Sequence, residues 1–280
     1  MLKKLDEILN QLEESTDKAL SMAESFGLKK STLEKIESFL TTLKKDRIGN
    51  YSRSLDNLRA IDKFRTKLTE YIGADTAKIN ADFSKSIGSN GKFINLYFSE
   101  MINGYENSVQ IYNDIRALSI YETNSLLIGS GMEASLSEPI ITLMKENVKG
   151  GTNFINLRKL LLNQLEGTPE TDGIVKRYVR QIVNDSVMTY NRSYMSAISS
   201  DLGLNHYLYK GTKIADTRSY CAARSGKVFT EEEVKKSASL EWAGKKKGTN
   251  SINILRFAGG YNCRHEYVPI SVEIYNTLNG

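Results

Sequence analysis

Proline is absent from the first 138 residues of this chain, so nothing in that stretch forces a helix to break. Apolar residues recur there every three or four positions, which is the spacing of one helix face. One such stripe consists of Leu2, Leu5, Ile8, Leu9 and Leu12. A second consists of Leu33, Ile36, Phe39, Leu40 and Leu43. The sequence therefore predicts a mainly helical N-terminal region.

Further helices are predicted from the same spacing, each bounded by a glycine-containing stretch. They cover about residues 55–72, 93–127, 139–148, 154–165 and 173–202. Ser31 stands three residues before Glu34, the spacing of a capping box, in which each side chain bonds a free amide at the helix start. This spacing predicts a helix that begins near Thr32.

Tyrosines lie on the apolar face of the last of these predicted helices. Tyr190 and Tyr194 continue the stripe of Val187 and Ile198 at helical spacing. Tyrosine is enriched at protein interfaces, but a stripe at this spacing is more often core packing. We interpret these tyrosines as core residues.

The pattern changes after residue 204. Residues 206–210 are rich in aromatic side chains and lie between two glycines, which is typical of a strand. Short strands are also predicted at 228–229, 252–257 and 261–270, with Pro269 at an edge or a strand end. Thr230 precedes three glutamates and is the expected N-cap of a short helix. The prediction is an α+β protein with a helical domain at 1–204 and a small α+β module at 205–280.

Composition excludes several classes of protein. The 280 residues are 40% hydrophobic and 25% charged, as in a water-soluble globular protein. The sequence has no run of about 20 apolar residues, so no membrane contact is expected. It also shows no secretory signal, and the protein is expected to act where it is made.

The net charge is +5, and most of the excess lies in the last 80 residues, which contain twelve basic and eight acidic residues. This balance is compatible with contact to nucleic acid or to an acidic protein surface.

Both cysteines lie in the C-terminal module, close to several charged and aromatic residues. Cys263 and His265 are two residues apart, so both side chains would share one face of a strand. Cys221 or His206 would complete the ligand set of a zinc ion. The paired CxxC arrangement of common zinc sites is absent. The alternative, which we favour from the residues alone, is that the two thiols simply pack together or form a disulfide.

Two catalytic arrangements are also conceivable. Cys263, His265 and Asp216 have the residue types needed for acyl transfer, although a shared strand face does not orient them for it. Arg218, Arg224, Arg264 and His265 would suit a phosphate-binding groove of a nuclease. The simpler expectation is that these arginines form ion pairs inside the module, with Asp216, Glu241 and Glu266.

The same segment resembles a known protein family. DTRSYCAARSGKVFT, then EW, then GGYNCRHEYVPI is similar to the C-terminal signature of the Mu F-like head-morphogenesis family, the minor head proteins of tailed bacteriophages. The resemblance covers about residues 205–272 and follows a long helical region, as in the family. It assigns these positions to the motif: Asp216, Arg218, Cys221, Arg224, Gly226, Trp242, Gly260, Asn262, Cys263, Arg264, His265 and Pro269.

The resemblance implies a structural virion component, without catalytic activity, that takes part in head morphogenesis and DNA packaging. Its implied partners are the portal protein and the major capsid protein, with packaged DNA nearby, and its implied location is the capsid interior near the portal vertex. Some relatives carry additional cysteines, whereas this chain has one Cys in each half of the signature, which counts against zinc. We therefore expect no cofactor, with zinc at Cys221, Cys263 and His265 as the alternative.

Two other functions compete with this one. The arginines and His265 would serve a nuclease or toxin-like module that the helical region delivers. The N-terminal apolar stripe would serve a coiled-coil scaffold or adaptor.

Overall fold

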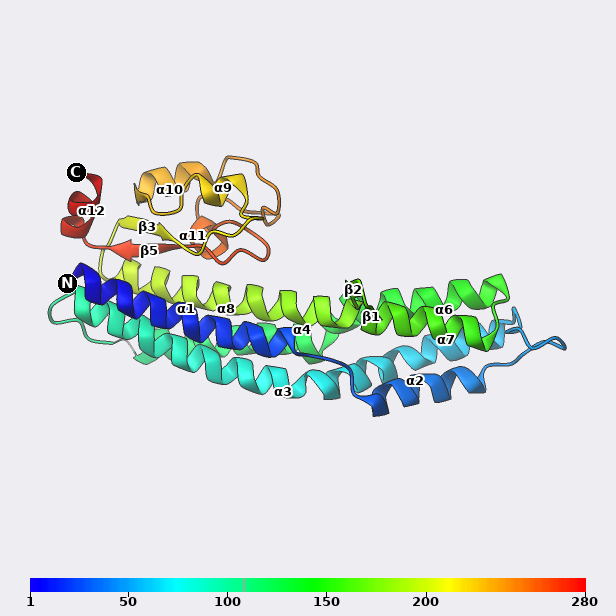
Figure 1. Cartoon of the computed structure of the whole chain (residues 1–280). Helices are drawn as coiled ribbons and strands as arrows, with labels where there is room; N and C mark the ends of the chain where they lie inside the picture. Colours follow the sequence, from blue (N-terminus) through cyan, green and yellow to red (C-terminus); the bar gives the residue numbers. More distant parts are fainter. Residues whose placement is uncertain (108) are drawn as a thin grey trace. The chain divides into compact units, whose positions relative to one another are not determined.

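The computed structural model describes residues 1–107 and 109–280. The protein is 67% helical with a small C-terminal sheet, which confirms the α+β class. No helix in these two ranges is long and apolar enough to cross a membrane. The elements before residue 204 are α1 (Leu2–Glu24), α2 (Lys30–Thr42), α3 (Leu55–Met101), α4 (Val109–Ile128), α5 (Ser130–Met132), the π-helix η1 (Glu133–Ser137), α6 (Glu138–Gly150), α7 (Phe154–Glu166), the hairpin β1 (Gly167–Thr168) and β2 (Thr171–Asp172), and α8 (Ile174–Asp201) (Figure 1).

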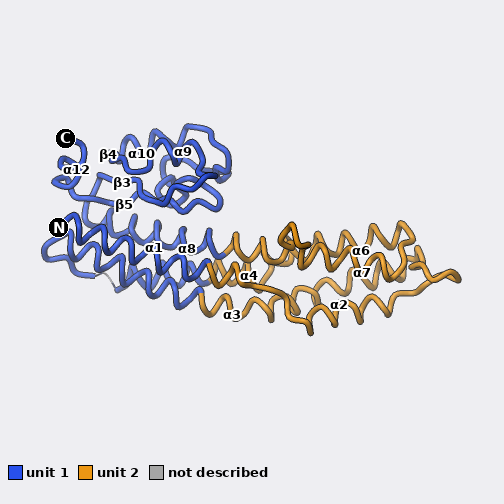
Figure 2. The backbone as a smooth tube through the Cα atoms, viewed as in Figure 1, with its two compact units in different colours: residues 1–20, 83–120, 183–280 blue, residues 21–82, 121–182 orange. Residues whose placement is uncertain are grey.

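The chain divides into two compact units that interleave along the sequence (Figure 2). Unit 1 contains residues 1–20, 83–120 and 183–280, and unit 2 contains residues 21–82 and 121–182. The change of pattern after residue 204 coincides with the step from α8 to the first strand of the C-terminal module. That module belongs to the same unit as parts of α1, α3, α4 and α8.

In unit 1, α1, α3 and α8 are joined by a buried polar cluster. The Asn90 side-chain amide donates to Thr16 Oγ1 at 3.0 Å and to Asn191 Oδ1 at 2.9 Å. Around it the apolar stripe of α1 is buried, apart from Leu2 at the helix start. Tyr190 and Tyr194 on α8 are fully buried, which confirms that the tyrosine stripe is core.

In unit 2, α2 begins at Lys30, two residues before Thr32, so the predicted start is confirmed, but Ser31 does not form the expected capping box. The N-cap is Lys29, whose amide donates to Asp75 Oδ2 of α3 at 2.9 Å. A carboxylate distant in the sequence therefore supplies an acceptor near the helix start, where the sequence pattern predicts a local Ser. Phe39 of α2 stacks on Phe64 of α3 with ring centroids 3.9 Å apart.

The sequence predicts separate helices at 55–72 and 93–127, divided at Gly73 and at the glycine-containing residues 86–91, but α3 is continuous from Leu55 to Met101. Gly91 is buried, and a Cβ atom there would lie 2.3 Å from Tyr112 Cε2 and 2.6 Å from the Tyr190 hydroxyl. Because Gly91 has no side chain, two tyrosines can pack against α3 at this position, and the helix continues through it. The single helix predicted at 93–127 is instead split between α3 and α4.

The C-terminal module contains a three-stranded antiparallel sheet in the order β4-β3-β5. Its elements are β3 (His206–Lys210), α9 (Ser219–Ala222), β4 (Val228–Thr230), α10 (Glu231–Ser237), α11 (Ile254–Phe257), β5 (Glu266–Ile270) and α12 (Val272–Asn279). Thr230 caps α10 through a complete capping box with Glu233, as its position predicts. Pro269 lies in the edge strand β5, as expected, and its carbonyl accepts from the Tyr97 hydroxyl at 2.8 Å.

Two strand predictions in the module are wrong. Residues 254–257 form the helical turn α11, and only residues 266–270 of the segment 261–270 are a strand. Ala258, Gly260 and Asn262 all have positive φ angles, of 41°, 96° and 54°. This tight turn holds the chain away from an extended path, and a period-two pattern does not reveal it.

A pair of alanine substitutions in α3 tests the packing role of Gly91. Gly91→Ala should lower the free energy of unfolding by about 1–3 kcal/mol, because the new methyl group overlaps two buried tyrosines. Gly88→Ala is the matched control: its Cβ has ordinary contacts at 3.7 Å or more, so it should raise stability by about 0.5–1 kcal/mol. Urea unfolding followed by circular dichroism measures both, and equal effects would refute this packing.

Candidate metal centre

Three buried sulfur- and nitrogen-bearing side chains meet in the C-terminal module. Cys221 lies on α9, Cys263 lies in the turn after α11, and His265 directly precedes β5. The two Sγ atoms are 3.6 Å apart, and Cys263 Sγ is 4.0 Å from His265 Nδ1. The possible ligand atoms all lie within 4.8 Å of one another, so this group could hold a metal ion. His206 is not part of this group, and its ring packs 4.3 Å from that of Tyr275.

The turn at residues 258–262 allows the two sulfur atoms to approach. The Gly259 backbone packs against both of them: a Cβ atom there would lie 2.4 Å from Cys263 Sγ and 2.5 Å from Cys221 Sγ. Gly260 faces the loop after α10, because its Cβ would lie 1.9 Å from the Gly244 carbonyl oxygen. Side chains at either position would push the turn away, so the sulfur pair depends on the two glycines.

Two charged residues of α8 hold this turn. Arg192 is 3% exposed and donates to the carbonyl oxygens of Cys263 at 2.6 Å and His265 at 2.7 Å. Asp185, two turns earlier on α8, accepts from the Asn262 amide at 2.7 Å and lies 3.6 Å from Lys246 Nζ. Residues seven apart share a helix face, so a single face of α8 fixes the backbone on both sides of Cys263.

The remaining sides of the group are covered. The Tyr209 ring stacks on His265 with centroids 5.6 Å apart, and its hydroxyl donates to Cys221 Sγ at 3.3 Å. Gly211 lies against the other part of the imidazole, since a Cβ there would be 2.7 Å from His265 Cγ. His265 Nε2 is buried and has no hydrogen-bond partner among the described residues.

The surroundings of the two thiols shift their pKa values in opposite directions. The hydrogen bond to Cys263, together with burial, raises the pKa of Cys221. The hydrogen bond with Cys221 lowers the pKa of Cys263, and His265 and the charge of Arg192 lower it further against the effect of burial. Cys263 is therefore the more acidic of the two thiols, and a thiolate is the form of cysteine that binds metal.

The residues fit a zinc ion. Zinc bound tetrahedrally at about 2.3 Å from each sulfur places two thiolates about 3.8 Å apart. The sulfur atoms are 3.6 Å apart here. The donor set is two sulfurs and an imidazole whose Nε2 is left without a partner in the described chain, and zinc sites commonly combine these ligand types. The Tyr209 hydroxyl would act as an outer hydrogen-bond donor to one ligand.

A cavity of about 410 Å³ adjoins the three possible ligands. Its wall also includes two carboxylates of α1, Glu13 and Asp17. Asp17 accepts from Arg264 at 3.1 Å, and Glu13 accepts from the Thr212 hydroxyl. The signature residues on this wall are Asp216, Arg218, Cys221, Asn262, Cys263, Arg264 and His265.

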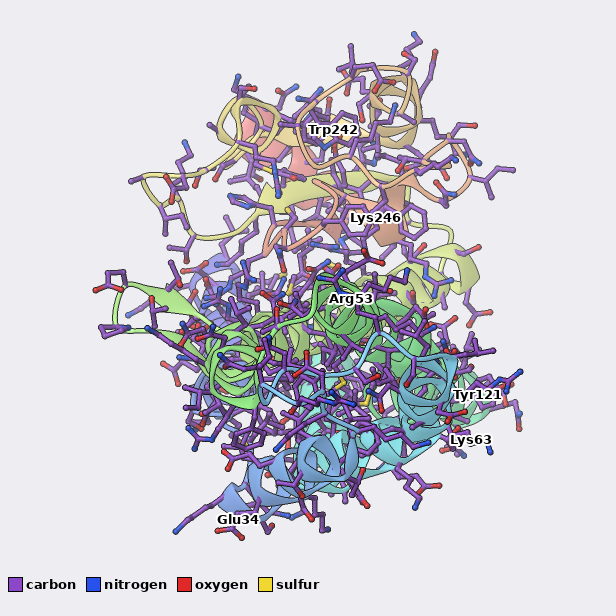
Figure 3. The ribbon with its side chains drawn as sticks, turned by 90° about the vertical axis from the view of Figure 1, so that its right-hand side faces the viewer. Glu34, Arg53, Lys63, Tyr121, Trp242 and Lys246 are labelled. Carbon is purple, nitrogen blue, oxygen red and sulfur yellow. The ribbon has the colours of Figure 1, made fainter. Side chains whose placement is uncertain are left out.

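The other signature side chains stabilise the module. Trp242 stacks on Tyr220 at a centroid distance of 4.0 Å, and Arg224 lies 3.8 Å from the same ring centroid. Such short distances require opposite faces of the ring, so Tyr220 lies between them. Trp242, labelled in Figure 3, also donates from Nε1 to the Gly259 carbonyl at 2.9 Å. The Gly226 amide, in a residue with positive φ, donates to the Tyr209 carbonyl at 2.8 Å.

The arginines do not have the partners expected from the sequence. Arg218 donates to the Tyr261 carbonyl at 2.7 Å, Arg224 stacks on Tyr220, and Arg264 pairs with Asp17. Arg218, Arg264 and His265 line the cavity described above, but Arg224 does not. Of the four residues considered for phosphate binding, three therefore share this cavity, and Arg224 lies apart from them.

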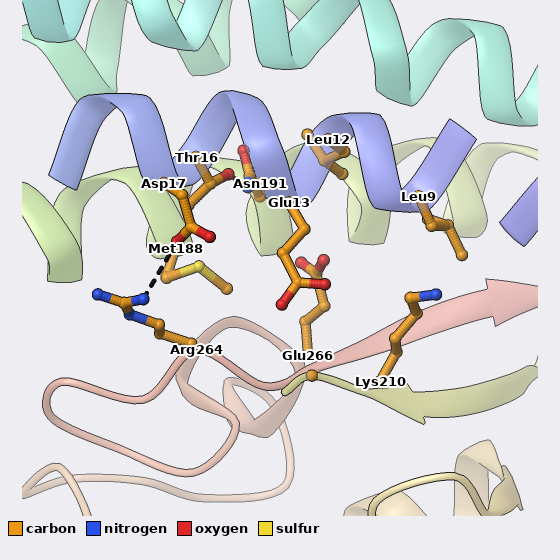
Figure 4. A pocket seen from close by; sticks show the side chains of 11 residues that line it. Leu9, Leu12, Glu13, Thr16, Asp17, Met188, Asn191, Lys210, Arg264 and Glu266 are labelled. Carbon is orange, nitrogen blue, oxygen red and sulfur yellow. Dashed lines mark hydrogen bonds and ion pairs between the residues drawn. The ribbon is translucent and has the colours of Figure 1, made fainter. Parts of the chain in front are cut away.

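A second, smaller cavity of about 30 Å³ lies between α1, α8 and the sheet (Figure 4). Glu13 and Glu266 project into it from opposite sides. Burial raises the pKa of Glu266 to about 7, and the charge of Glu13 adds to the increase. Glu266 thus faces α1 in place of the expected arginine partner.

The sequence reasoning missed the residues outside the module that complete this site. Arg192 and Asp185 lie within the helix that was interpreted only for its tyrosines, and Glu13 and Asp17 lie near the N-terminus. Arg192 lies between Met188 and Met195 at helical spacing, and Asp185 lies seven residues earlier on the same face. Charged residues that share a helix face with apolar ones are the signal that could have identified it.

Comparison with known proteins adds no relative: no protein-family model, no curated protein and no solved structure matches this chain.

Replacing Arg192 tests whether it holds the turn. Arg192→Met should lower the free energy of unfolding by about 3 kcal/mol, because two buried carbonyl groups lose a charged donor. Arg180→Met, on the same helix, removes an exposed pair with Asp172 and should cost less than about 1 kcal/mol. Urea unfolding measures both changes, and similar values for the two variants would contradict this role.

Proposed function

We propose that this protein is a structural minor head protein of a tailed bacteriophage and has no catalytic role. The proposal is based on the sequence resemblance of about residues 205–272, and one structural observation supports it. Most signature positions make contacts that lock the module together: Trp242 with Gly259, Arg224 with Tyr220, Arg218 with Tyr261, and Gly260 with Gly244. Residues used in this way are typical of a stable building block.

The attachment of the module to the helices also supports a structural role. Arg192, Asp185 and Tyr97 each bond the module backbone, and Arg264 pairs with Asp17 of α1. These contacts join segments up to 247 residues apart in the chain. The module and the helices are therefore tied into one compact unit, as a structural role requires.

The partners and location follow from the same proposal. The protein associates with the portal protein and the major capsid protein, in the capsid interior near the portal vertex. It takes part in head morphogenesis and DNA packaging. The basic excess of the last 80 residues suits proximity to packaged DNA, because lysine and arginine replace the counterions of phosphate groups.

We further propose that Cys221, Cys263 and His265 bind one zinc ion in this protein. Their distances and burial support the assignment. The ion would join α9, the turn after α11 and the start of β5, which are otherwise linked through hydrogen bonds and packing. Bound there, it would add to the stability of the module.

Particle composition tests the head-protein proposal. Particles of the phage that encodes this chain are purified on a density gradient and analysed by quantitative mass spectrometry. The protein should be present in few copies relative to the major capsid protein, and it should remain with the head after tails are removed. The same gradient fractions from uninfected cells are the control. A protein absent from intact particles would end this proposal.

Metal content and stability test the zinc assignment. The reduced protein should hold one equivalent of zinc, with both thiols protected from a thiol reagent. Free zinc at about 100 times its dissociation constant should stabilise the fold by about 2.7 kcal/mol. Cys263→Ser should abolish this stabilisation, whereas Ser219→Ala, an exposed control on α9, should retain it. Equal zinc responses in the wild type and Cys263→Ser would refute the assignment.

A further inference from the structure

The metal centre has fewer protein ligands than a structural zinc site needs. The group contains three protein donors, and no fourth His, Cys, Asp or Glu of the described chain belongs to it. Structural zinc sites use four protein ligands, whereas sites with three keep one position for water or another small molecule. Cys221, Cys263 and His265 thus leave one tetrahedral position unfilled.

The unfilled position faces the larger cavity. Gly259 covers both sulfur atoms on one side, and Tyr209 and Gly211 cover the imidazole. The cavity of about 410 Å³ is lined by all three ligands, so it supplies the space beside them. A molecule in this cavity can reach a metal ion that the polypeptide shields elsewhere.

The nearby carboxylates are not arranged as a fourth ligand. Glu13 accepts from Thr212, and Asp17 pairs with Arg264. Asp216 lines the cavity but is exposed and lies outside the ligand group. Asp216 is therefore the residue that would have to move for the site to close, and its replacement can be tested.

One cationic group on the cavity wall is placed to attract an anion. The wall carries three carboxylates, Glu13, Asp17 and Asp216, and two guanidinium groups, those of Arg218 and Arg264. Arg264 pairs with Asp17, whereas the Arg218 guanidinium donates to a neutral carbonyl, that of Tyr261. A zinc ion with two thiolates and a neutral imidazole has no net charge, which leaves Arg218 to attract the incoming ligand.

We propose that this centre is an open zinc site, whose fourth position holds exchangeable water and takes small monodentate anions, with Arg218 as a positioning residue. The proposal rests on the zinc ion proposed above and goes beyond it by assigning a ligand-binding function. It concerns ligand exchange only and includes no reaction step.

Cobalt substitution tests the proposal, because Co²⁺ takes zinc sites and its visible spectrum reports coordination. The full-length protein, kept reduced with a phosphine, is loaded with one equivalent of Co²⁺ and titrated with sodium azide. We expect a saturable change in the visible bands. Arg218→Gln should still bind cobalt but weaken azide binding by about tenfold. Arg224→Gln, which lies outside the cavity wall, should leave azide binding unchanged.

The other outcomes overturn the proposal in distinguishable ways. If cobalt binds but azide changes nothing, the site is closed and the open position is refuted while the zinc site stands. In that case azide sensitivity that appears in Asp216→Asn would identify Asp216 as the closing ligand. If no cobalt binds, the zinc assignment and this inference fail together, and the head-protein proposal is still decided by particle composition.

Discussion

The guanidinium of Arg192 is the contact on which the organisation of unit 1 depends most. It is buried on α8 and satisfies the carbonyl groups of Cys263 and His265, with a longer bond at 3.4 Å to the Phe257 carbonyl. A buried cation is costly unless it is well bonded, and a turn with three positive φ angles is costly unless it is held. The carbonyl groups of the turn offset the cost of burying Arg192, and the hydrogen bonds from Arg192 offset the strain of the turn. Helix α8 and the turn therefore stabilise each other.

The same arrangement sets the chemistry of the cysteines. Because Arg192 fixes the backbone on both sides of Cys263, the sulfur of this residue stays close to that of Cys221 and to the imidazole. The positive charge of Arg192 also helps to lower the pKa of Cys263. A buried thiolate needs a compensating charge, and a metal ion supplies it at short range. The proposed zinc site is thus a consequence of how the module is attached to α8.

Much of the fold could be predicted from the sequence, because helical periodicity and capping are local. The ranges of α6, α7 and α8, the strand β3 and the capping box at Thr230 follow from such patterns. The wrong strands come from a local turn with three positive φ angles, and the errors in the helical region come from contacts between distant residues. Two tyrosines pack on Gly91 inside α3, and Asp75 accepts a hydrogen bond from the amide of Lys29, the N-cap of α2.

The candidate site was predictable only in part. Cysteine and histidine are common metal ligands, so the sequence alone suggests Cys221, Cys263 and His265 as one group. Their shared strand face was the wrong reason, because a turn and not a strand brings Cys263 to His265. The contributions of Arg192, Asp185 and Asp17 come from helices that are remote in sequence. No local pattern could place them.

X-ray absorption spectroscopy at the zinc edge tests the proposed zinc site directly, because it counts the ligand atoms of the bound ion. We expect two sulfur atoms at about 2.3 Å and two lighter atoms at about 2.0–2.1 Å, one from His265 and one from the exchangeable ligand. A shell made only of nitrogen and oxygen would contradict it, since the ion would then lie away from Cys221 and Cys263.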